Sequence, residues 1–209
     1  MLADSGCDLT LIEIDRDLSA ALAVDFPMAR LITQDVMQID FTELASSGAG
    51  LRIVGNLPYN ISTPLLFKLF QHANVIEDMY FMLQLEVVDR MTAVPSTKSY
   101  GRLSIMTQLH CDPQKMFEVP PEAFSPRPKV QSAIIRLIPK EERLEVDAKL
   151  LESILRQAFS ARRKTIRNAM KNFLSADEIT SLDLNPSLRP ENLTIEDFVN
   201  CARLAAARL

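Results

Sequence analysis

Strand signals and helix signals alternate along the first 112 residues, and this alternation constrains the fold more than any other feature. The segment LTLIEID (Leu9 to Asp15) is typical of a buried strand, and a second strand is predicted from about Arg30 to Gln34. The strand LRIVG (Leu51 to Gly55) precedes a helix from about Ser62 to His72, which leads into the strand MYFMLQ (Met79 to Gln84). Strands that alternate with helices predict an α/β fold with a parallel sheet.

Each of the first three predicted strands ends in a polar acceptor: Glu13 and Asp15, then Asp35, then Asn56. An acidic residue at a strand end is placed to accept both ribose hydroxyls of a nucleoside cofactor, and a second carboxylate can accept an adenine amino group. Solvated acids at strand ends are the commoner case for any single residue. Three in succession favour a nucleoside-binding site.

The four residues Asn56, Leu57, Pro58 and Tyr59 lie between a strand and a helix, for which Ser62 or Thr63 is the expected cap. An adenine amino group is a poor nucleophile because its lone pair is delocalised into the ring. Asn56 Oδ1 and the carbonyl of Leu57 or Pro58 could accept hydrogen bonds from its two N–H groups, which would favour tetrahedral geometry at the nitrogen. Tyr59 offers a face on which a flipped base can stack. The alternative is a capped turn with Tyr59 in the core.

A basic segment without acidic residues lies between Glu152 and Asp177. On a single helix, four of its cations would share one arc beside an apolar face. This pattern favours contact with a polyanion, and the alternative is a solvated helix face. The cations of the segment are Arg156, Arg162, Arg163, Lys164, Arg167 and Lys171.

The proline-rich segment PPEAFSPRPK lies between two strands predicted at about Lys115 to Val119 and Gln131 to Ile138. Its prolines favour a stiff, extended backbone that could present Phe124 to a base, although Phe124 could equally fill the core. A polar loop from Pro95 to Gly101 is either a flap or an ordinary surface loop. The segment Arg102 to Cys111 is ambiguous, and we favour a helix there. A helical region is expected from Asp147 to Leu209, with capping signals at Ser175 with Glu178 and at Thr194 with Asp197.

Composition narrows the class of protein. With 209 residues, 47% of them hydrophobic, the chain can fill one core and a small appendage. Three widely spaced cysteines indicate neither a disulfide framework nor a metal site, so we expect a cytoplasmic protein without a metal. No apolar run has membrane-spanning length. A net charge of −4 restricts any RNA contact to a local patch, and nothing indicates an interface between copies, so we expect a monomer.

Seven segments resemble the small-subunit (16S) rRNA adenine dimethyltransferases, relatives of the large-subunit adenine methyltransferases that confer resistance. They occur in the order of that family and cover nearly the whole chain. The segments are LIEIDRDL, QDVMQIDF, GNLPYNISTPLLFKLF, YFMLQLEVVDRM, SYGRLSIMTQ, VPPEAFSPRPKVQSAIIRL and AFSARRKTIRNAM.

The resemblance implies a role for each candidate residue. Glu13 would hold the ribose of S-adenosylmethionine, Asp35 its adenine, and Asn56 would face both the methionyl end and the target amine. Tyr59 and Phe124 would sandwich the target adenine. The segment RRKTIRN lies where the family binds rRNA, which agrees with the RNA-binding role assigned to Arg162, Arg163, Lys164, Arg167 and Lys171.

The chain also departs from that family. The family pattern places a strand, a glycine-rich turn and a helix before the ribose-binding strand, and the pair Gly48 and Gly50 precedes a strand where a cofactor turn should follow one. We therefore expect a truncated gene product, a misplaced start codon or an incomplete sequence. The missing strand belongs in the middle of the sheet, so its loss should expose two strand edges or force them to pair with each other.

We therefore expect a Rossmann-like class I methyltransferase sheet lacking its first strand, over residues 1–140, and a small all-α RNA-binding domain over residues 141–209. The expected function is S-adenosylmethionine-dependent dimethylation of adenosine N6 in 16S rRNA within the small ribosomal subunit during ribosome biogenesis. The alternative is a noncatalytic RNA-binding remnant or assembly factor that cannot hold the cofactor.

Overall fold

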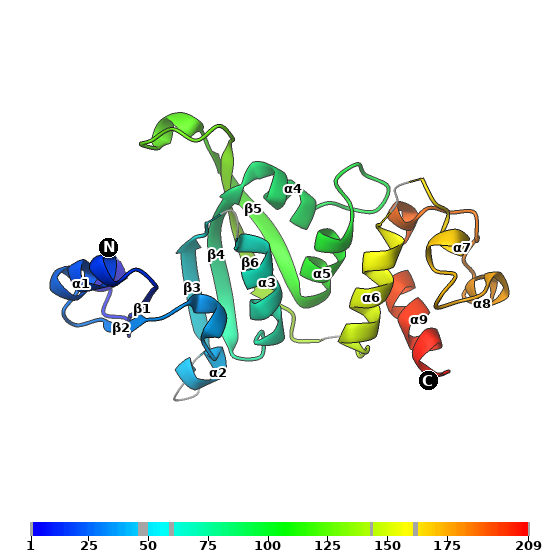
Figure 1. Ribbon diagram of the computed structural model, residues 1–209, viewed down its shortest axis with the longest axis horizontal. Coiled ribbons are helices and arrows are strands. Elements are labelled where there is room, and N and C mark those ends of the chain that lie inside the picture. Colours follow the sequence, from blue (N-terminus) through cyan, green and yellow to red (C-terminus); the bar gives the residue numbers. More distant parts are fainter. Residues whose placement is uncertain (1, 46–49, 59–60, 143, 161–162, 209) are drawn as a thin grey trace.

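The strands form two separate sheets in the computed structural model (Figure 1), which describes all residues except 1, 46–49, 59–60, 143, 161–162 and 209. In the smaller sheet, β1 (Thr10–Glu13) runs parallel to β2 (Arg30–Thr33). The larger sheet has the order β3-β4-β6-β5. Its strands are β3 (Leu51–Asn56), β4 (Ile76–Gln84), β5 (Cys111–Val119) and β6 (Ser132–Pro139).

Strand pairing in the larger sheet changes from parallel to antiparallel along the chain. β3 pairs with β4 in parallel, with Asn56 opposite Met82. β6 then pairs antiparallel with both β4 and β5. The parallel pair therefore brings Asn56 to the same sheet edge as the carboxyl end of β4, which is the edge where α/β folds bind ligands.

Helices follow most of the strands. The N-terminal and sheet-associated helices are α1 (Arg16–Asp25), α2 (Phe41–Leu44), α3 (Ser62–Gln71), α4 (Leu85–Met91) and α5 (Arg102–His110). The C-terminal helices are α6 (Ala148–Ala158), α7 (Ile166–Ala169), α8 (Ala176–Ser181) and α9 (Ile195–Ala206). Short 3₁₀ helices are η1 (Leu2–Asp4), η2 (Val36–Gln38), η3 (Pro121–Ala123) and η4 (Pro190–Asn192).

One face of the larger sheet is buried beneath α3, α4 and α5. Met79 and Phe81 of β4 and Ile135 of β6 lie on this face and are at most 1% exposed. They pack against Leu66 of α3 and Val88 of α4 in one cluster. Because side chains alternate between the two faces of a strand, this cluster fixes the register of the sheet.

The opposite face, which we call the second face, carries the alternate residues of the same strands. Val54 on β3 and Phe117 on β5 are 54% and 60% exposed, and Tyr80, Met82 and Ile134 are half-buried. Register places these side chains in one continuous surface, because Val54 lies opposite Tyr80, and Met82 lies beside Ile134, which in turn lies opposite Phe117. The larger sheet is therefore well covered on one face only.

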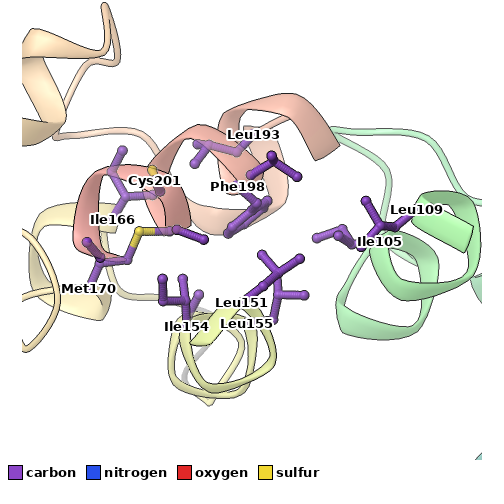
Figure 2. Close-up of a cluster of buried hydrophobic side chains, with 14 of the residues drawn as sticks. Ile105, Leu109, Leu151, Ile154, Leu155, Ile166, Met170, Leu193, Phe198 and Cys201 are labelled. Carbon is purple, nitrogen blue, oxygen red and sulfur yellow. The ribbon is translucent and has the colours of Figure 1, made fainter. Parts of the chain in front are cut away.

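The C-terminal helices have their own core, shown in Figure 2. Phe198 and Cys201 of α9 are fully buried with Leu151 and Ile154 of α6. Ile105 of α5 belongs to the same cluster, so this core also includes a helix of the preceding region. The polypeptide passes from β6 to α6 between residues 139 and 148, and the division at residues 140 and 141 stays a prediction.

The N-terminal unit of β1, α1 and β2 is loosely packed. The prediction of a buried first strand is wrong, because all four residues of β1 are half-buried. Between residues 3 and 38, Ser19 is the one buried residue, while Ile14, Leu18 and Val24 are more than half exposed. Two strands and one helix cannot enclose a core, which explains the exposure.

Several local predictions are confirmed and one is corrected. The capping boxes expected at Ser175 and Thr194 are present, and the ambiguous segment after Gly101 is helix α5. The cap of α3 is Ile61, with no side-chain cap, instead of Ser62 or Thr63. No helix in the described part of the chain is long and apolar enough to cross a membrane.

The expected long basic helix is wrong. Of the described residues from 163 to 171, only Ile166–Ala169 (α7) are helical, so Arg163 and Lys164 precede the helix and Lys171 follows it. The physical reason is that the backbone turns to pair elsewhere: Ile166 N donates to the Leu188 carbonyl at 2.7 Å.

Candidate active site

Glu13 and Asp35 lie at the carboxyl ends of neighbouring strands in the smaller sheet. Glu13 is the last residue of β1, lies opposite Thr33, and accepts a 2.9 Å hydrogen bond from Asp15 N through Oε1. Asp35 follows β2 and caps η2, where its Oδ1 accepts from Met37 N at 2.9 Å. These backbone contacts fix the direction of both carboxylates and leave each group with further acceptor capacity.

Asp15 caps a helix, whereas the sequence also allowed it to bind the ribose of a cofactor. Its carboxylate caps α1, because Oδ1 accepts from Asp17 N at 2.8 Å and from Leu18 N at 3.0 Å. Capping satisfies two backbone donors at the helix start. Of the two acids at the end of β1, Glu13 is therefore the better placed to bind a ligand.

Asn56, Leu57 and Pro58 leave β3 and lead into α3. Asn56 is the exposed last residue of the strand, whereas Leu57 is 8% exposed and belongs to the core. Leu57 N donates to the Met82 carbonyl, which continues the pairing with β4 by one residue. The buried Leu57 side chain thus anchors the segment, while the Asn56 amide extends from the carboxyl edge of the sheet.

The Pro58 carbonyl is used within the fold. It accepts hydrogen bonds from Ile61 N and Ser62 N, both at 3.1 Å, and so begins helix α3. Both lone pairs of this oxygen are engaged. Of the two carbonyls considered in the sequence, only that of Leu57 remains a good candidate to accept a substrate amine.

Two aromatic residues were expected to contact a base. Tyr59 lies outside the described residues. Phe124 is half-buried at the end of η3, in the segment that joins β5 to β6, and its N–H donates to the Pro121 carbonyl at 3.3 Å. Figure 1 shows this segment extending beyond the body of the sheet on the side of α4. The roles of both residues stay predictions.

A shallow pocket at the carboxyl end of β4 was not identified from the sequence. Its volume is about 350 Å³, and Gln84 and Leu85 line it from the strand end while Ser99 and Gln131 line it from two connecting segments. Leu85 N donates to the Gln131 carbonyl at 2.8 Å, which holds two of these segments together. Gln84, the polar last residue of the strand, was the available signal, since polar residues at this edge can contact a ligand.

The loop from Pro95 to Gly101 is tied to the C-terminal helices. Ser96 N donates to the Glu191 carbonyl at 2.7 Å, and Asn192 Nδ2 lies 3.2 Å from Ser96 Oγ. Tyr100 is only 5% exposed and packs edge-on against Phe159. These contacts favour an ordinary surface loop over a flap.

The basic segment is exposed even though it is not one helix. Arg163, Lys164, Arg167 and Lys171 are all exposed, and among the described residues none of them forms an ion pair. Arg162 lies outside the described residues. The apolar side chains between these cations point into the core: Ile166, Ala169 and Met170 are at most 2% exposed. The expected separation of polar and apolar side chains is therefore present, with different backbone geometry.

The fit of these residues to a nucleoside cofactor is only partial. Glu13 and Asp35 occupy adjacent parallel strand ends, where carboxylates can accept from a ribose and an adenine amino group. Asn56 belongs to the other sheet, and β1 is not hydrogen-bonded to β3. The residues expected to bind the nucleoside therefore lie in the smaller sheet, and the residue expected to face the reacting methyl group lies in the larger sheet.

The fold and strand-end residues define a class of protein: a Rossmann-like α/β methyltransferase with a C-terminal helical unit. Solved structures agree. A dimethyladenosine transferase from Plasmodium falciparum superimposes with a TM-score of 0.79 at 26% identity, covering 95% of this chain and 82% of that one. The 23S rRNA methyltransferase ErmE has the same fold, with a TM-score of 0.67 at 22% identity over 98% of this chain and 84% of that one.

The model of the family described as "Ribosomal RNA adenine dimethylase" matches residues 2–207. A protein named ribosomal RNA small subunit methyltransferase A from Pseudomonas aeruginosa is 50% identical over 210 residues, which is 98% of this chain and 78% of that protein. Its namesake from Vibrio parahaemolyticus is also 50% identical, over 94% of this chain and 75% of its own length. The chain belongs to the ribosomal RNA adenine dimethylase family.

Proposed function

We propose that this chain transfers methyl groups from S-adenosylmethionine to N6 of adenosines in the 16S rRNA of the small ribosomal subunit. The observation that carries the proposal is the position of Asn56 and Leu57 at the carboxyl end of β3, in a chain of the rRNA adenine dimethylase family. The relatives named as small subunit rRNA methyltransferases support the choice of this RNA. Such an enzyme acts in the cytoplasm as a monomer.

The chemistry depends on the hydrogen bonds of the target amine. Asn56 Oδ1 accepts one N–H of the adenine amino group and the Leu57 carbonyl accepts the other, which draws the nitrogen toward tetrahedral geometry and frees its lone pair. The backbone of both residues is held in place before the substrate binds, because the Leu57 side chain is buried and Asn56 is paired with Met82 in the sheet. Preorganised dipoles of this kind supply much of enzymatic catalysis.

Glu13 and Asp35 hold the nucleoside of the cofactor. The Glu13 carboxylate accepts from the ribose hydroxyls and the Asp35 carboxylate from the adenine amino group, while Asn56 faces the methionyl end. When bound, S-adenosylmethionine supplies an electrophilic methyl group on a sulfonium. The half-buried positions of Glu13 and Asp35 support these roles, because partial burial strengthens hydrogen bonds to a carboxylate.

Tyr59 and Phe124 stack on the two faces of the target adenine. A base must leave its helical stack to reach Asn56, and stacking on aromatic side chains stabilises the flipped base by about 1–3 kcal/mol. In the C-terminal helical region, the exposed cations Arg163, Lys164, Arg167 and Lys171, together with Arg162, bind phosphates of the rRNA. The absence of ion pairs to these cations among the described residues supports this role, since they are available to a polyanion.

The alternative function is that of a noncatalytic rRNA-binding factor. One observation favours it: Glu13 and Asp35 are in one sheet and Asn56 is in the other. Isothermal titration with S-adenosylmethionine separates the two proposals. The methyltransferase requires binding at cofactor concentrations that support turnover, whereas the RNA-binding factor shows subunit binding without cofactor binding.

The proposed activity is tested by incubating the chain with radiolabelled S-adenosylmethionine and small subunits that lack adenine methylation. Digestion of the rRNA to nucleosides should yield labelled N6,N6-dimethyladenosine. Large subunits serve as the control substrate and should remain unlabelled. If the small-subunit rRNA carries no label although the chain still binds the subunit, the noncatalytic alternative is favoured.

A further inference from the structure

We propose that the pocket at the carboxyl end of β4 binds the base of the nucleotide next to the target adenosine in the RNA, and that it selects a base with an exocyclic amino group. We call this pocket the neighbour-base pocket. The proposal rests on the proposed function, since it takes the ligand to be RNA with one adenosine at Asn56. It adds a second point of base recognition to that site.

Strand register places the neighbour-base pocket beside Asn56 and on the same face of the sheet. Asn56 lies opposite Met82, and Gln84, which lines the pocket, follows two residues later on β4. Side chains alternate along a strand and paired residues share a face, so Asn56, Met82 and Gln84 all extend from the second face. Two residues of strand rise and one strand spacing separate Asn56 from Gln84 by roughly 8 Å.

This separation fits two adjacent nucleotides whose bases are unstacked. Stacked bases rise only about 3.4 Å per step along one strand of a nucleic-acid helix, so a base at Asn56 and a base at Gln84 cannot stack on each other. Proteins that read RNA sequence bind such splayed bases in single-stranded segments. The pocket volume of about 350 Å³ lies at the low end of the range for small-ligand sites, about 300–1,000 Å³, and suits a single base.

Three polar side chains that line the pocket have unused hydrogen-bonding capacity. Among the residues that the structure describes, the Gln84 amide, the Glu86 carboxylate and the Ser99 hydroxyl form no hydrogen bond or ion pair. Gln84 precedes α4 as its N-cap residue, but its side chain does not cap the helix. These three groups are available to a ligand, whereas Asp89 is paired with Lys115 at 3.2 Å.

The chemistry of the lining favours a base over a phosphate. The charged residues that line the pocket are the acids Glu86 and Asp89, which repel a phosphate group. A carboxylate accepts a hydrogen bond from an exocyclic amino group, and a glutamine amide can accept from this group while it donates to a ring nitrogen. Leu85 and Val130 supply apolar contact to the face of the base. Adenine and cytosine have an amino group beside an acceptor nitrogen, and uracil has no amino group.

One wall of the pocket is held by the C-terminal helical unit. Ser99 belongs to the loop at residues 95–101, and Ser96 N of this loop donates to the Glu191 carbonyl at 2.7 Å. The pocket therefore lies where the carboxyl edge of the sheet meets the unit that carries the exposed cations. This is a suitable position for RNA that contacts both.

Short RNA probes test the pocket without requiring catalysis. The probe is a fluorescein-labelled oligouridylate with two consecutive adenosines at its centre, which set the register because uridine has no amino group. Replacing either adenosine by purine riboside deletes one exocyclic amino group. Fluorescence anisotropy with the full chain gives the affinities. Each replacement should weaken binding by the wild-type chain about tenfold, the usual order for one specific base contact.

Variants assign each adenosine to its site. In the double variant Gln84→Ala with Glu86→Ala, one replacement should cost less than about twofold in affinity while the other keeps its full effect. In Asn56→Ala the pattern should be reversed. Glu43→Ala is the matched control and should behave as wild type, because Glu43 is an exposed acid of α2, at the other end of the larger sheet from α4 (Figure 1).

A single variant covers the case in which the double variant fails to fold. Glu86→Ala then decides, because the Glu86 side chain is exposed, and it should about halve the cost of the replacement assigned to the pocket. If the same adenosine responds to Asn56→Ala and to the pocket variants, the pocket belongs to the target base and the proposal is wrong. Unchanged discrimination in the pocket variants would also overturn it. So would a wild-type chain that does not discriminate, or that binds no RNA up to about 1 mM.

Methyl transfer is measured separately with labelled S-adenosylmethionine and small subunits. Discrimination between the probes without methyl transfer would retain the neighbour-base pocket and contradict the methyltransferase assignment. Methyl transfer without discrimination by the pocket would retain the activity and overturn the pocket. The two proposals therefore fail in distinguishable ways.

Discussion

The guanidinium of Arg52 on β3 donates a 2.7 Å hydrogen bond from Nε to the carboxylate of Asp78 on β4, and the Asp78 side chain is 1% exposed. Arg136 on β6 donates to the same carboxylate at 3.1 Å. One buried acid thus connects three strands on the second face of the larger sheet. Breaking a buried ion pair leaves an uncompensated charge, so this carboxylate is a sensitive point for stability.

Asp78→Asn should destabilise the chain toward the lower end of about 3–5 kcal/mol, because Arg52 and Arg136 are partly exposed. The measurement is urea unfolding at pH 7. Asp112→Asn is the control, since Asp112 is exposed and lies 3.6 Å from Lys140, and it should change stability by less than about 1 kcal/mol. Equal effects of the two changes would contradict the role assigned to Asp78.

The pKa of the same carboxyl group predicts how the stability of the fold changes at acidic pH. Burial raises the pKa of Asp78, but the hydrogen bonds and charges of Arg52 and Arg136 lower it more, and the net pKa lies below the ordinary value. Its stabilisation is therefore complete above the unfolded pKa of about 3.9 and is lost as pH falls through the folded pKa. Wild type should lose stability faster than Asp78→Asn below about pH 4, and parallel curves from pH 7 to pH 2 would refute this.

Asn56→Ala should reduce methyl transfer by at least about two orders of magnitude, the usual effect of losing one preorganised polar contact. Turnover is measured on small subunits that lack adenine methylation. Asn74→Ala, an exposed amide between α3 and β4, is the control and should retain activity. Near-normal turnover of Asn56→Ala would exclude Asn56 as the amine acceptor.

Neutralising Arg163, Lys164 and Arg167 to Gln should weaken small-subunit binding without affecting the fold, because these side chains are exposed. Phosphate contacts release counterions, so the slope of log affinity against log salt should become shallower by up to about 0.7–0.9 per lost contact. Filter binding at several salt concentrations gives the slope. Lys149→Gln is the control, and weakened binding with an unchanged slope would indicate an effect on packing instead.

Cys201 should react with a thiol reagent only when the chain unfolds. Burial, together with the negative charge of Asp197, raises the pKa of this thiol to about 12. Exposed Cys7 should account for the fast labelling at pH 8, and Cys7→Ser should abolish that phase. Because the folded pKa is raised, the stabilisation from Cys201 is lost as pH rises above about 8.5. Fast labelling of Cys201 in native chain would show that its core opens locally.

Local sequence signals determined the elements of this protein and the chemistry at their ends. Apolar segments located β4 and β6, and a Ser175 to Glu178 spacing located a capping box that the structure contains. Glu13, Asp35 and Asn56 could be selected because strand ends in a parallel sheet point to one edge. These features depend on neighbouring residues in the chain, which is why sequence alone is sufficient for them.

Only the tertiary structure decided how these elements are partnered. The hydrogen bond from Ile166 N to Leu188 O places the start of α7 at Ile166, after Arg163 and Lys164, and the start of α3 engages the Pro58 carbonyl. The division into two sheets leaves β1 half-buried and separates Glu13 from Asn56. The physical reason is common to all three: burial and backbone hydrogen bonds are satisfied by distant segments, and local propensity does not specify which segment will be the partner.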